Sequence, residues 1–568
     1  MREKAAPVRF AVLRLLGPAV ACVALVLVSA GGVHAQVPGP NINIVSGTGF
    51  PDGDPFLQRQ NEPSIAISTR NPCHLLAGAN DYRPVDAAGV VEDDATGDAW
   101  LGLFKSFDCG RTWKSNLIPG WPFDKTADGK ASPLFGLAAG ADPIVRAGAG
   151  GMFYYSGIAF DRGSNGKSKV FVARFIDTNL AVAENGTPKD PIAYAGTAVV
   201  DSGTSGQFID KPSIAVDAPR NNGVTCTVNG ESVPGGTVYI AWADFVGQVK
   251  NNNARLRVAQ STDCGATWTR PAKVSEGLHT NQGAMLAVAP NGTVYVAWRQ
   301  FAYDDQPDAI IVSRSTDFGR TFSKPQTIAT ISPFDQGTSG VSFRTNTYPT
   351  MAIDGANRVY VAWSARGFAT PRSDAKTGDA RVVMSTSEDG TTWTAPWAVE
   401  QQAPQGHQIM PALAFAAGRL QLIYYDLRDD HSYLVYQPAD GTSYGYTPSR
   451  QAVGDPPEKV FWQQIAETDP TGVLLQRRHT IDVRGAQAPA GPSPAFTSWP
   501  ISQYLFGVAG PNVEQMQFNP PNLPLYAKGS APFIGDYIDV AGLSFVPKPG
   551  GSWAFNTDST GTQFFQAV

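Results

Sequence analysis

A hydroxyl, a carboxylate and an aromatic ring recur at fixed spacing in this chain, and together they could supply a nucleophile, an acid and a binding surface. The pattern Ser-x-Asp-x-Gly-x-Thr-Trp or a close variant stands at 106–113, 261–268, 315–322 and, more loosely, 386–393. Its acidic position is held by Asp108, Asp263, Asp317 and Glu388. Four scattered copies cannot surround one substrate, whereas Asp, Ser and Gly are typical turn residues. We therefore interpret the motif as a structural turn.

The segments around the motif predict what this turn connects. Three runs are nearly identical: GTVYIAWADF (236–245), GTVYVAWRQF (292–301) and RVYVAWSAR (358–366). Each follows one apolar run and precedes another, and the motif with one more apolar run comes next. The repeating unit is therefore four strands, with the motif between the third and the fourth. Four-stranded units in series are typical of a β-propeller.

Seven such units can be traced, which predicts an all-β propeller of seven four-stranded blades. The second and last units are the weakest matches, so six blades is the alternative. The last unit has three strands, at 537–543, 552–558 and 562–568, before the sequence ends. An open blade would expose a sheet edge. We therefore expect the N-terminal strand 41–47 to pair with 562–568 and close the fold.

The ends and composition of the chain indicate its location and exclude some partners. Basic residues, an apolar run and small residues ending at Ala35 are typical of a signal peptide at 1–35, which leaves 36–568 as a single propeller domain. We expect a secreted or periplasmic protein without a stable membrane anchor. The net charge of −5 argues against nucleic-acid binding. An insertion at about 437–479 in the sixth unit contains a predicted short helix at 455–467.

The turn motif and two further segments resemble sequences of a known family. The Ser-x-Asp-x-Gly-x-Thr-Trp pattern resembles the Asp box (BNR repeat) of sialidases and related propeller proteins. NEPSIAIS (61–68) and FIGDYIDVAG (533–542) are similar to segments of secreted bacterial proteins of the sialidase superfamily. The resemblance implies a glycoside hydrolase acting on glycans with a carboxylate-bearing terminal sugar, and we expect a monomer. A non-catalytic propeller that binds glycans or proteins remains the alternative.

The four cysteines after the signal peptide are placed in turns that share one face of such a propeller. Cys73 and Cys226 precede the second strands of the first and third units, and Cys109 and Cys264 lie in the turn motifs of the same units. We predict the disulfides Cys73–Cys109 and Cys226–Cys264, with four free thiols as the alternative. No metal motif is present, and no cofactor is expected.

The opposite face should carry the site. The residues at the starts of the first strands are Glu62, Asp142, Asp210, Gln282, Tyr348, Met410 and Asp536, and they should surround the mouth of a central channel. Sialidases use a tyrosine nucleophile activated by a glutamate, with an aspartate as acid/base. The resemblance puts Tyr537 in the nucleophile's place, with Asp536 beside it. Asp81 and Glu62 are the acid/base candidates.

Arginines at the ends of the second strands are the candidates for binding a substrate carboxylate, because a guanidinium can clamp it through two parallel hydrogen bonds. With Tyr348, the substrate-binding set is Arg83, Arg299, Arg366 and Arg428. The alternative is that they pair with nearby acids. The sequence departs from the family in lacking an Arg-Ile-Pro in the first unit and an evident activating glutamate. We expect Tyr537 beside a carboxylate in the channel, with at least two of Arg299, Arg366 and Arg428.

Overall fold

The computed structural model describes most of the chain after its first 38 residues. Its continuous stretches are 39–45, 60–84, 98–161, 166–180, 190–203, 206–217, 225–247, 253–335, 344–370, 373–401, 406–428, 481–502, 534–549, 553–556 and 561–568, with several short isolated strands between them. The signal-peptide prediction lies outside the described residues. Within them, no helix is long and apolar enough to cross a membrane.

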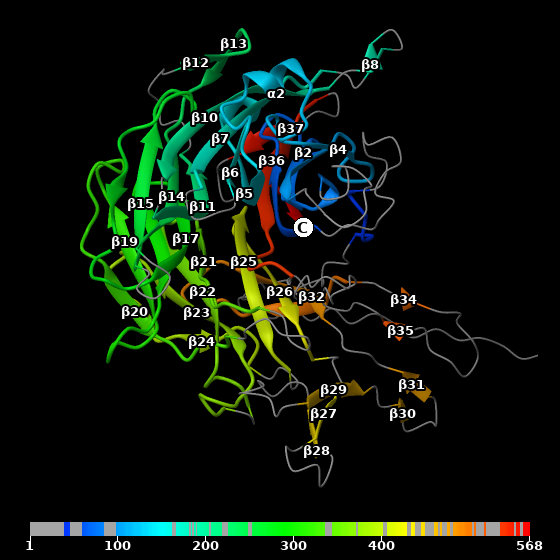
Figure 1. Ribbon diagram of the computed structural model, residues 1–568, viewed down its shortest axis with the longest axis vertical. Helices are drawn as coiled ribbons and strands as arrows, with labels where there is room; N and C mark the ends of the chain where they lie inside the picture. The colour runs from blue at the N-terminus through cyan, green and yellow to red at the C-terminus, as the bar shows by residue number, and fades with distance from the viewer. Residues whose placement is uncertain are drawn as a thin grey trace, which may run out of the picture. The chain divides into compact units, whose positions relative to one another are not determined.

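The described residues form antiparallel β-sheets with very little helix (Figure 1). The first sheet contains β1 (Gln60–Ile67), β2 (Leu75–Asp81), β3 (Trp100–Ser106) and β4 (Lys114–Leu117). The second contains β5 (Ala139–Ala147), β6 (Met152–Phe160), β7 (Ser168–Asp177) and β10 (Ile192–Gly203). The third contains β11 (Gln207–Val216), β14 (Val238–Val246), β15 (Asn253–Ser261) and β16 (Ala272–Lys273).

Four more sheets follow in chain order. The fourth contains β17 (Asn281–Val288), β18 (Val294–Gln300), β19 (Ala309–Ser315) and β20 (Gln326–Thr330). The fifth contains β21 (Thr350–Ile353), β22 (Val359–Ala365), β23 (Arg381–Ser387) and β24 (Trp397–Ala398). The sixth contains β25 (Gln408–Ala416), β26 (Arg419–Asp426), β32 (Asp482–Pro489) and β33 (Thr497–Pro500). The seventh has three strands, β36 (Val540–Pro547), β37 (Trp553–Asn556) and β38 (Thr562–Ala567).

The first strand of each sheet contacts the first strand of the next, from β1 through β5, β11, β17, β21 and β25 to β36. Strand β36 also contacts β1, although the two are far apart in sequence. Figure 1 accordingly shows the red strand β36 beside the blue and cyan strands of the first two sheets. The expectation of an all-β fold built from four-stranded antiparallel sheets is confirmed.

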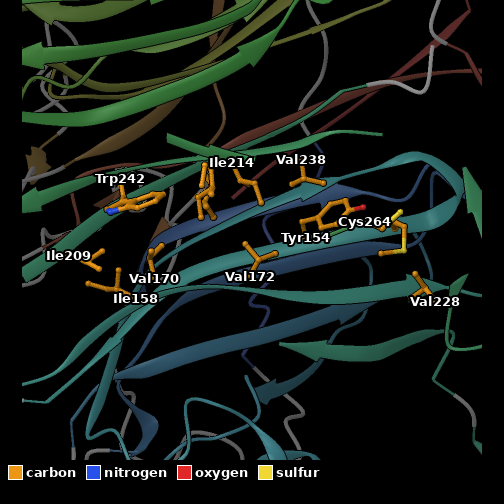
Figure 2. Close-up of a cluster of buried hydrophobic side chains, with 14 of the residues drawn as sticks. Tyr154, Ile158, Val170, Val172, Ile209, Ile214, Val228, Val238, Trp242 and Cys264 are labelled. Atoms are coloured by element: carbon orange, nitrogen blue, oxygen red, sulfur yellow. The ribbon is translucent and has the colours of Figure 1, made fainter. Parts of the chain in front are cut away.

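The second strands are apolar on both faces because each sheet lies between two others. In β14, Val238, Ile240 and Trp242 pack against the second sheet. Tyr239 and Ala241, which point to the other face, pack against the fourth. Figure 2 shows the first of these clusters, with Trp242 and Val238 beside side chains of β6 and β7. Nearly continuous apolar runs are the pattern of strands that are covered on both faces.

Hydroxyl groups near the starts of three first strands join neighbouring sheets in pairs. Ser64 Oγ accepts a hydrogen bond from the backbone N–H of Val145 at 2.9 Å. The hydroxyls of Ser213 and Thr350 accept equivalent bonds from the fourth and sixth sheets, from Leu286 at 3.1 Å and Leu413 at 3.0 Å. We call these three bonds the hydroxyl clamps. They fix the spacing of sheets one and two, three and four, and five and six.

The repeated turn motif bonds to its own backbone, as predicted. Asp108 accepts hydrogen bonds from the backbone N–H of Thr112 at 2.9 Å and from its hydroxyl at 2.6 Å. Ser106 Oγ donates to Asp108 at 2.9 Å and accepts from the backbone N–H of Gly110 at 2.9 Å. Gly110 has a φ of 84°, which favours glycine. The same bonds recur around Asp263 and Asp317.

The fourth copy corrects the predicted acidic residue. Asp389, not Glu388, accepts the backbone N–H groups of Thr391 and Thr392, each at 2.7 Å. Ser387 Oγ donates to Asp389 at 3.1 Å. Glu388 is exposed and pairs with Arg358. The turn is one residue shorter here, because Gly390 directly follows Asp389, whereas one residue separates Asp108 from Gly110. The carboxylate that bonds to the turn is therefore that of Asp389, one position after the predicted Glu388.

Both predicted disulfides are confirmed. Cys73 is bonded to Cys109, and Cys226 is bonded to Cys264. In the first pair, the backbone N–H of Cys109 also donates to the carbonyl of Cys73 at 3.0 Å. Each disulfide therefore attaches a turn motif to the segment before the second strand of its own sheet.

The predicted closure by the N-terminal strand is wrong for the residues that the structure describes. Residues 41–45 form no strand, and β38 pairs with β36, which lies between β37 and β38. Ile44 and Val45 instead pack against apolar side chains of the first and seventh sheets, including Ile65 and Val568. Their apolar surface is thus buried without backbone pairing.

The predicted helix in the insertion of the sixth unit is also corrected. The predicted helix at 455–467 contains β29 (Lys459–Gln463) and the start of β30 (Ala466–Thr468) instead. Val460, Phe461 and Trp462 in this segment are β-branched or aromatic, which favours a strand. The insertion leaves the sheet between its second strand, β26, and its third strand, β32.

Candidate active site

A strained backbone conformation recurs where the first strands of the sheets begin. Positive φ angles are found at Glu62 (51°), Asp142 (57°), Lys211 (46°), Gly283 (67°) and Met410 (51°). All but Gly283 precede a proline, and the register of each strand with its neighbour shifts at this point. For residues other than glycine such angles cost free energy and cluster at functional sites. The bulge places polar side chains of several sheets at the same end of the first strands.

Glu62 is the most deeply buried acid of this group, with 1% of its surface exposed. Its Oε1 accepts hydrogen bonds from the backbone N–H of Asp536 at 3.0 Å and from Lys211 Nζ at 3.2 Å. Its Oε2 accepts from Asn80 Nδ2 at 2.7 Å. Burial raises the pKa of Glu62 to about 7, against the opposing effect of the Lys211 charge. The Glu62 carboxyl group can therefore hold or release a proton near neutral pH.

Asp536 and Lys211 form the ion pair at the centre of the cluster. Lys211 Nζ lies 2.6 Å from Asp536 Oδ2. Arg344 binds the same carboxylate through two bonds, with Nε at 3.0 Å and Nη2 at 2.5 Å. Burial alone would lower the pKa of Lys211, but Asp536, Glu62 and other acids together raise it well above its ordinary value. One carboxylate thus holds two cations beside Glu62.

Asp142 and Asp210 extend the cluster into the second and third sheets. The backbone N–H of Lys211 donates to Asp142 Oδ2 at 3.0 Å. Burial raises the pKa of Asp142 to about 6. Asp210 accepts from Gln282 Nε2 at 2.9 Å, and Gln282 in turn accepts from the hydroxyl of Tyr348 at 3.0 Å. Four sheets therefore share one continuous polar network.

Two tyrosine rings flank the Lys211 ammonium group. Nζ lies 5.7 Å from the ring centre of Tyr348 and 5.9 Å from that of Tyr537. The Tyr537 hydroxyl donates to the carbonyl of Pro143 at 2.8 Å. Burial raises the pKa of Tyr537 well above its ordinary value. This phenol bonds to a carbonyl rather than to the carboxylate that the sequence had led us to expect.

A cavity of about 330 Å³ begins at this cluster and follows the first strands. Lys211, Tyr348, Met410, Asp536 and Tyr537 line it, and all seven sheets contribute to its wall. None of Arg299, Arg366 and Arg428 is among the lining residues. The structure therefore does not bring these arginines together with Tyr537, which corrects the expected geometry.

The predicted arginines pair with acids instead. Arg299 is almost fully buried and forms two bonds with Asp308, at 2.9 and 2.6 Å. It forms two more with Asp335, at 2.8 and 2.6 Å. Arg83 binds both oxygens of Asp81, with Nε at 2.9 and 2.8 Å. These charges are satisfied within the protein, as the alternative interpretation of the sequence expected.

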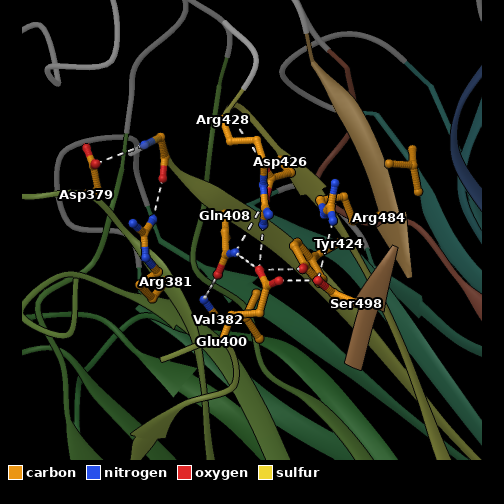
Figure 3. A network of polar contacts seen from close by, with 12 residues as sticks. Asp379, Arg381, Val382, Glu400, Gln408, Tyr424, Asp426, Arg428, Arg484 and Ser498 are labelled. Carbon is orange, nitrogen blue, oxygen red and sulfur yellow. Dashed lines mark hydrogen bonds and ion pairs between the residues drawn. The ribbon is translucent and has the colours of Figure 1, made fainter. Parts of the chain in front are cut away.

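Arg366 directly follows β22 of the fifth sheet, and Arg428 lies two residues after β26 of the sixth. Arg428 bonds to Asp426 at 2.8 Å and to Glu400 at 2.5 Å. Figure 3 shows Glu400 at the centre of this network, where it also accepts from the Tyr424 hydroxyl at 2.8 Å. Arg366 is buried, and its guanidinium carbon lies 5.1 Å from the ring centre of Phe334.

The sequence analysis predicted most of the polar residues that meet at the starts of the first strands, but it missed the two cations, Lys211 and Arg344. Lys211 directly precedes Pro212, as Glu62 and Asp142 precede their prolines. An alignment on these prolines would have found it. Arg344 lies outside the repeating unit, and no local pattern marked it. No group of His, Cys, Asp and Glu that could hold a metal ion is found in the described part of the chain.

Comparison with known proteins leaves the family open. No family model and no curated protein matches the chain. Among solved structures, it is similar to an α-L-arabinofuranosidase of Fusarium graminearum in complex with arabinobiose, at 14% identity over 65% of this chain and 90% of that chain, with a TM-score of 0.38. It is similar to the Hadza microbial sialidase Hz136 at 15% identity over 64% and 63%, with a TM-score of 0.36.

A leech intramolecular trans-sialidase is similar at 12% identity over 82% of this chain and 70% of that chain, with a TM-score of 0.30. These identities and scores are low. We therefore base the function of this protein on the residues of its own site.

Proposed function

We propose that the chain is a glycoside hydrolase in which Glu62 is the acid/base and Asp536 the partner carboxylate. The observation that carries this proposal is the position of Glu62 Oε1, 3.0 Å from the backbone N–H of Asp536. Glycosidases use two carboxyl groups whose environments differ, one protonated and one charged. Burial raises the pKa of Glu62 to about 7, whereas Asp536 is ion-paired with Lys211.

The neighbouring side chains would bind the sugar. Tyr348 and Tyr537 present rings at the cavity wall, and a pyranose can pack against such rings. Lys211 in the cavity wall and Arg344, which binds the same Asp536 carboxylate, are the cations that a carboxylate-bearing sugar would meet, in place of an arginine triad. The Tyr537 hydroxyl bonds to a backbone carbonyl, so we assign Tyr537 to binding rather than to nucleophilic attack.

The proposal also covers the fold that carries the site and the location of the protein. The seven sheets would be the blades of a single propeller, with β1 against β36 as its closing contact. Export from the cytoplasm would suit the two disulfides, because such bonds persist in oxidising compartments.

Hydrolysis of a panel of fluorogenic glycosides tests the proposal. The panel contains sialosides, uronides and neutral glycosides, and it is run on the purified full-length chain. We expect turnover of at least one member, and a loss of about 100-fold or more in Glu62→Gln and in Asp536→Asn. Glu388→Gln is the matched control, because Glu388 is an exposed acid away from the cavity, and it should keep the wild-type rate. Equal rates in Glu62→Gln and the wild type would disprove the assignment.

A non-catalytic glycan-binding or protein-binding propeller is the second candidate. It is favoured by the burial of the acids, since Glu62, Asp142 and Asp536 expose only 1%, 6% and 2% of their surfaces. Binding to an immobilised glycan array without turnover of any member of the panel would select this function.

A further inference from the structure

An aromatic side chain lies beside the polar end of the cavity, outside its wall. Phe301 directly follows β18, and its backbone N–H donates to the carbonyl of Thr280 at 2.9 Å. The centre of its ring lies 6.5 Å from that of Tyr348, and the two rings meet edge to face. Tyr348 lines the cavity and Phe301 does not. Phe301 therefore continues the aromatic surface from the cavity wall to the neighbouring part of the fourth sheet.

The Phe301 ring is supported on one face by Arg299. The guanidinium carbon lies 3.9 Å from the ring centre, and Arg299 is almost fully buried. The bonds from Arg299 to Asp308 and Asp335 fix the position of the guanidinium group. Phe301 itself stays partly exposed. Because the ring is already held in place, binding a ligand on it costs little ordering of side chains.

The two acids that hold Arg299 can also accept hydrogen bonds from a ligand. Both bonds from Arg299 to Asp308 end on Oδ1, and in the described part of the chain no hydrogen bond reaches its Oδ2. The side chains of Asp308 and Asp335 are 16% and 36% exposed. A carboxylate accepts strong hydrogen bonds from hydroxyl groups. An aromatic ring with such acceptors nearby suits a sugar, whose C–H groups pack on the ring while its hydroxyls bond to the acids.

The charge of this surface favours a neutral sugar. Residues 301–308 include Asp304, Asp305 and Asp308 but no basic residue. Adding Asp335 and Arg299 still leaves acids in excess, so an anionic sugar would be repelled here. The polar end of the cavity differs, because its wall includes the Lys211 ammonium group.

We propose that Phe301, Asp308 and Asp335 bind a neutral sugar next to the one in the cavity, so that the substrate is an oligosaccharide. The inference rests on the proposed function, in which Glu62 and Asp536 act on the sugar in the cavity. Arg299 then has a different role from the one expected from the sequence. It supports the ring and orients the two acids instead of binding a carboxylate of the substrate.

Calorimetric titration of the full-length Glu62→Gln variant tests the inference, since this variant should bind sugars without cleaving them. The probes are three matched pairs: sialic acid and 3′-sialyllactose, glucuronic acid and glucuronosyl-xylobiose, and glucose and cellotriose. In each pair the longer probe adds two neutral sugars to the same terminal sugar. We expect the longer probe of at least one pair to bind about ten-fold or more tightly than the terminal sugar alone.

Phe301→Ala in the same background gives the decisive comparison. It should bind both members of the responding pair equally, whereas Phe301→Tyr keeps the ring and should keep the gain. Phe318→Ala is the matched control, because Phe318 is an exposed ring of the same sheet, in the turn motif at its other end, and it should also keep the gain. If Phe301→Ala does not fold, Phe301→Leu replaces it, since leucine keeps apolar volume over Arg299 but has no flat face.

Two results would overturn the inference: no gain from the added neutral sugars in any pair, or an equal gain in the Phe301→Ala variant. If the wild type also hydrolyses short glycosides, either result leaves the proposed function standing. The opposite case is a gain that depends on Phe301 in a protein whose wild type hydrolyses no member of the glycoside panel. That outcome would contradict the proposed hydrolysis and retain neutral-sugar binding at Phe301, in a glycan-binding protein.

Discussion

Ser64 donates a hydrogen bond to Asp539 at 2.5 Å across 475 residues of sequence. The same carboxylate accepts from Arg146 Nη1 at 2.6 Å and from the backbone N–H of Ile65 at 3.3 Å. Ser64 and Ile65 belong to the first sheet and Arg146 to the second, while Asp539 directly precedes β36 of the seventh. One buried acid thus joins the beginning of the sheet series to its end.

Replacing this acid should loosen that junction. We expect Asp539→Asn to lower the free energy of unfolding by about 2 kcal/mol, because it leaves Arg146 without its charged partner. Urea denaturation followed by tryptophan fluorescence measures the change. Glu231→Gln is the control: Glu231 and its partner Arg70 are both partly exposed, and Arg70 also bonds to the carbonyl of Asp177, so the loss should cost no more than about 0.5 kcal/mol. Equal effects of the two substitutions would contradict the closing role of Asp539.

The Glu62 carboxyl group should make stability depend on pH. Its pKa is raised from 4.5 to about 7 by burial, so between these values the folded state holds more protons than the unfolded state. The stabilisation is complete below about pH 4.5 and is lost as the pH rises towards 7. The loss amounts to about 3 kcal/mol at 1.36 kcal/mol per pKa unit.

Glu62→Gln removes this titration. The free energy of unfolding of the variant, relative to that of the wild type, should therefore rise steadily between pH 4.5 and pH 7. Thermal or urea unfolding of both proteins at several pH values gives the difference directly. A difference that is constant over this range would show that Glu62 titrates normally in the folded protein.

The fourth turn motif offers a comparison between adjacent acids. Asp389 accepts backbone N–H groups, and these bonds hold its pKa far below the usual range, whereas Glu388 is exposed and pairs with the Arg358 side chain. We expect Asp389→Ala to lower the midpoint of thermal unfolding and Glu388→Ala to leave it unchanged. A lower midpoint for Glu388→Ala and an unchanged one for Asp389→Ala would instead support Glu388 as the acidic residue of this motif.

The strands and turns could be predicted because their information is local and repeated. Runs such as VYVAW carry apolar side chains on both faces, and the turn motif marks the end of the third strand. The closure could not be predicted, because residues 41–45 and 562–568 are both apolar enough to form strands. Their sequences do not show that Ile44 would pack against the first sheet while β38 pairs with β36.

The sequence predicted where the site lies, but not all of the residues that form it. Strand starts identify Glu62, Asp142, Tyr348 and Asp536 as neighbours because the repeat fixes the register. In the third sheet the residue with positive φ is Lys211 rather than Asp210, one position later than we expected. The arginines were misread for another reason. Arg299 pairs with Asp335, 36 residues away, in a segment outside the strands of the unit.

The hydroxyl clamps have a consequence for how the protein responds to its solution. They join six sheets in three neutral pairs, and seven is an odd number, so the seventh sheet is left without one. Its contacts with the first two sheets are made by Asp539 instead, which accepts a hydrogen bond from Ser64 of the first sheet and pairs with Arg146 of the second. Neutral hydrogen bonds are insensitive to ionic strength, but an ion pair with a partly exposed guanidinium is screened by salt. The attachment of the seventh sheet to the second should therefore weaken as the salt concentration rises, whereas the three clamped contacts should not change.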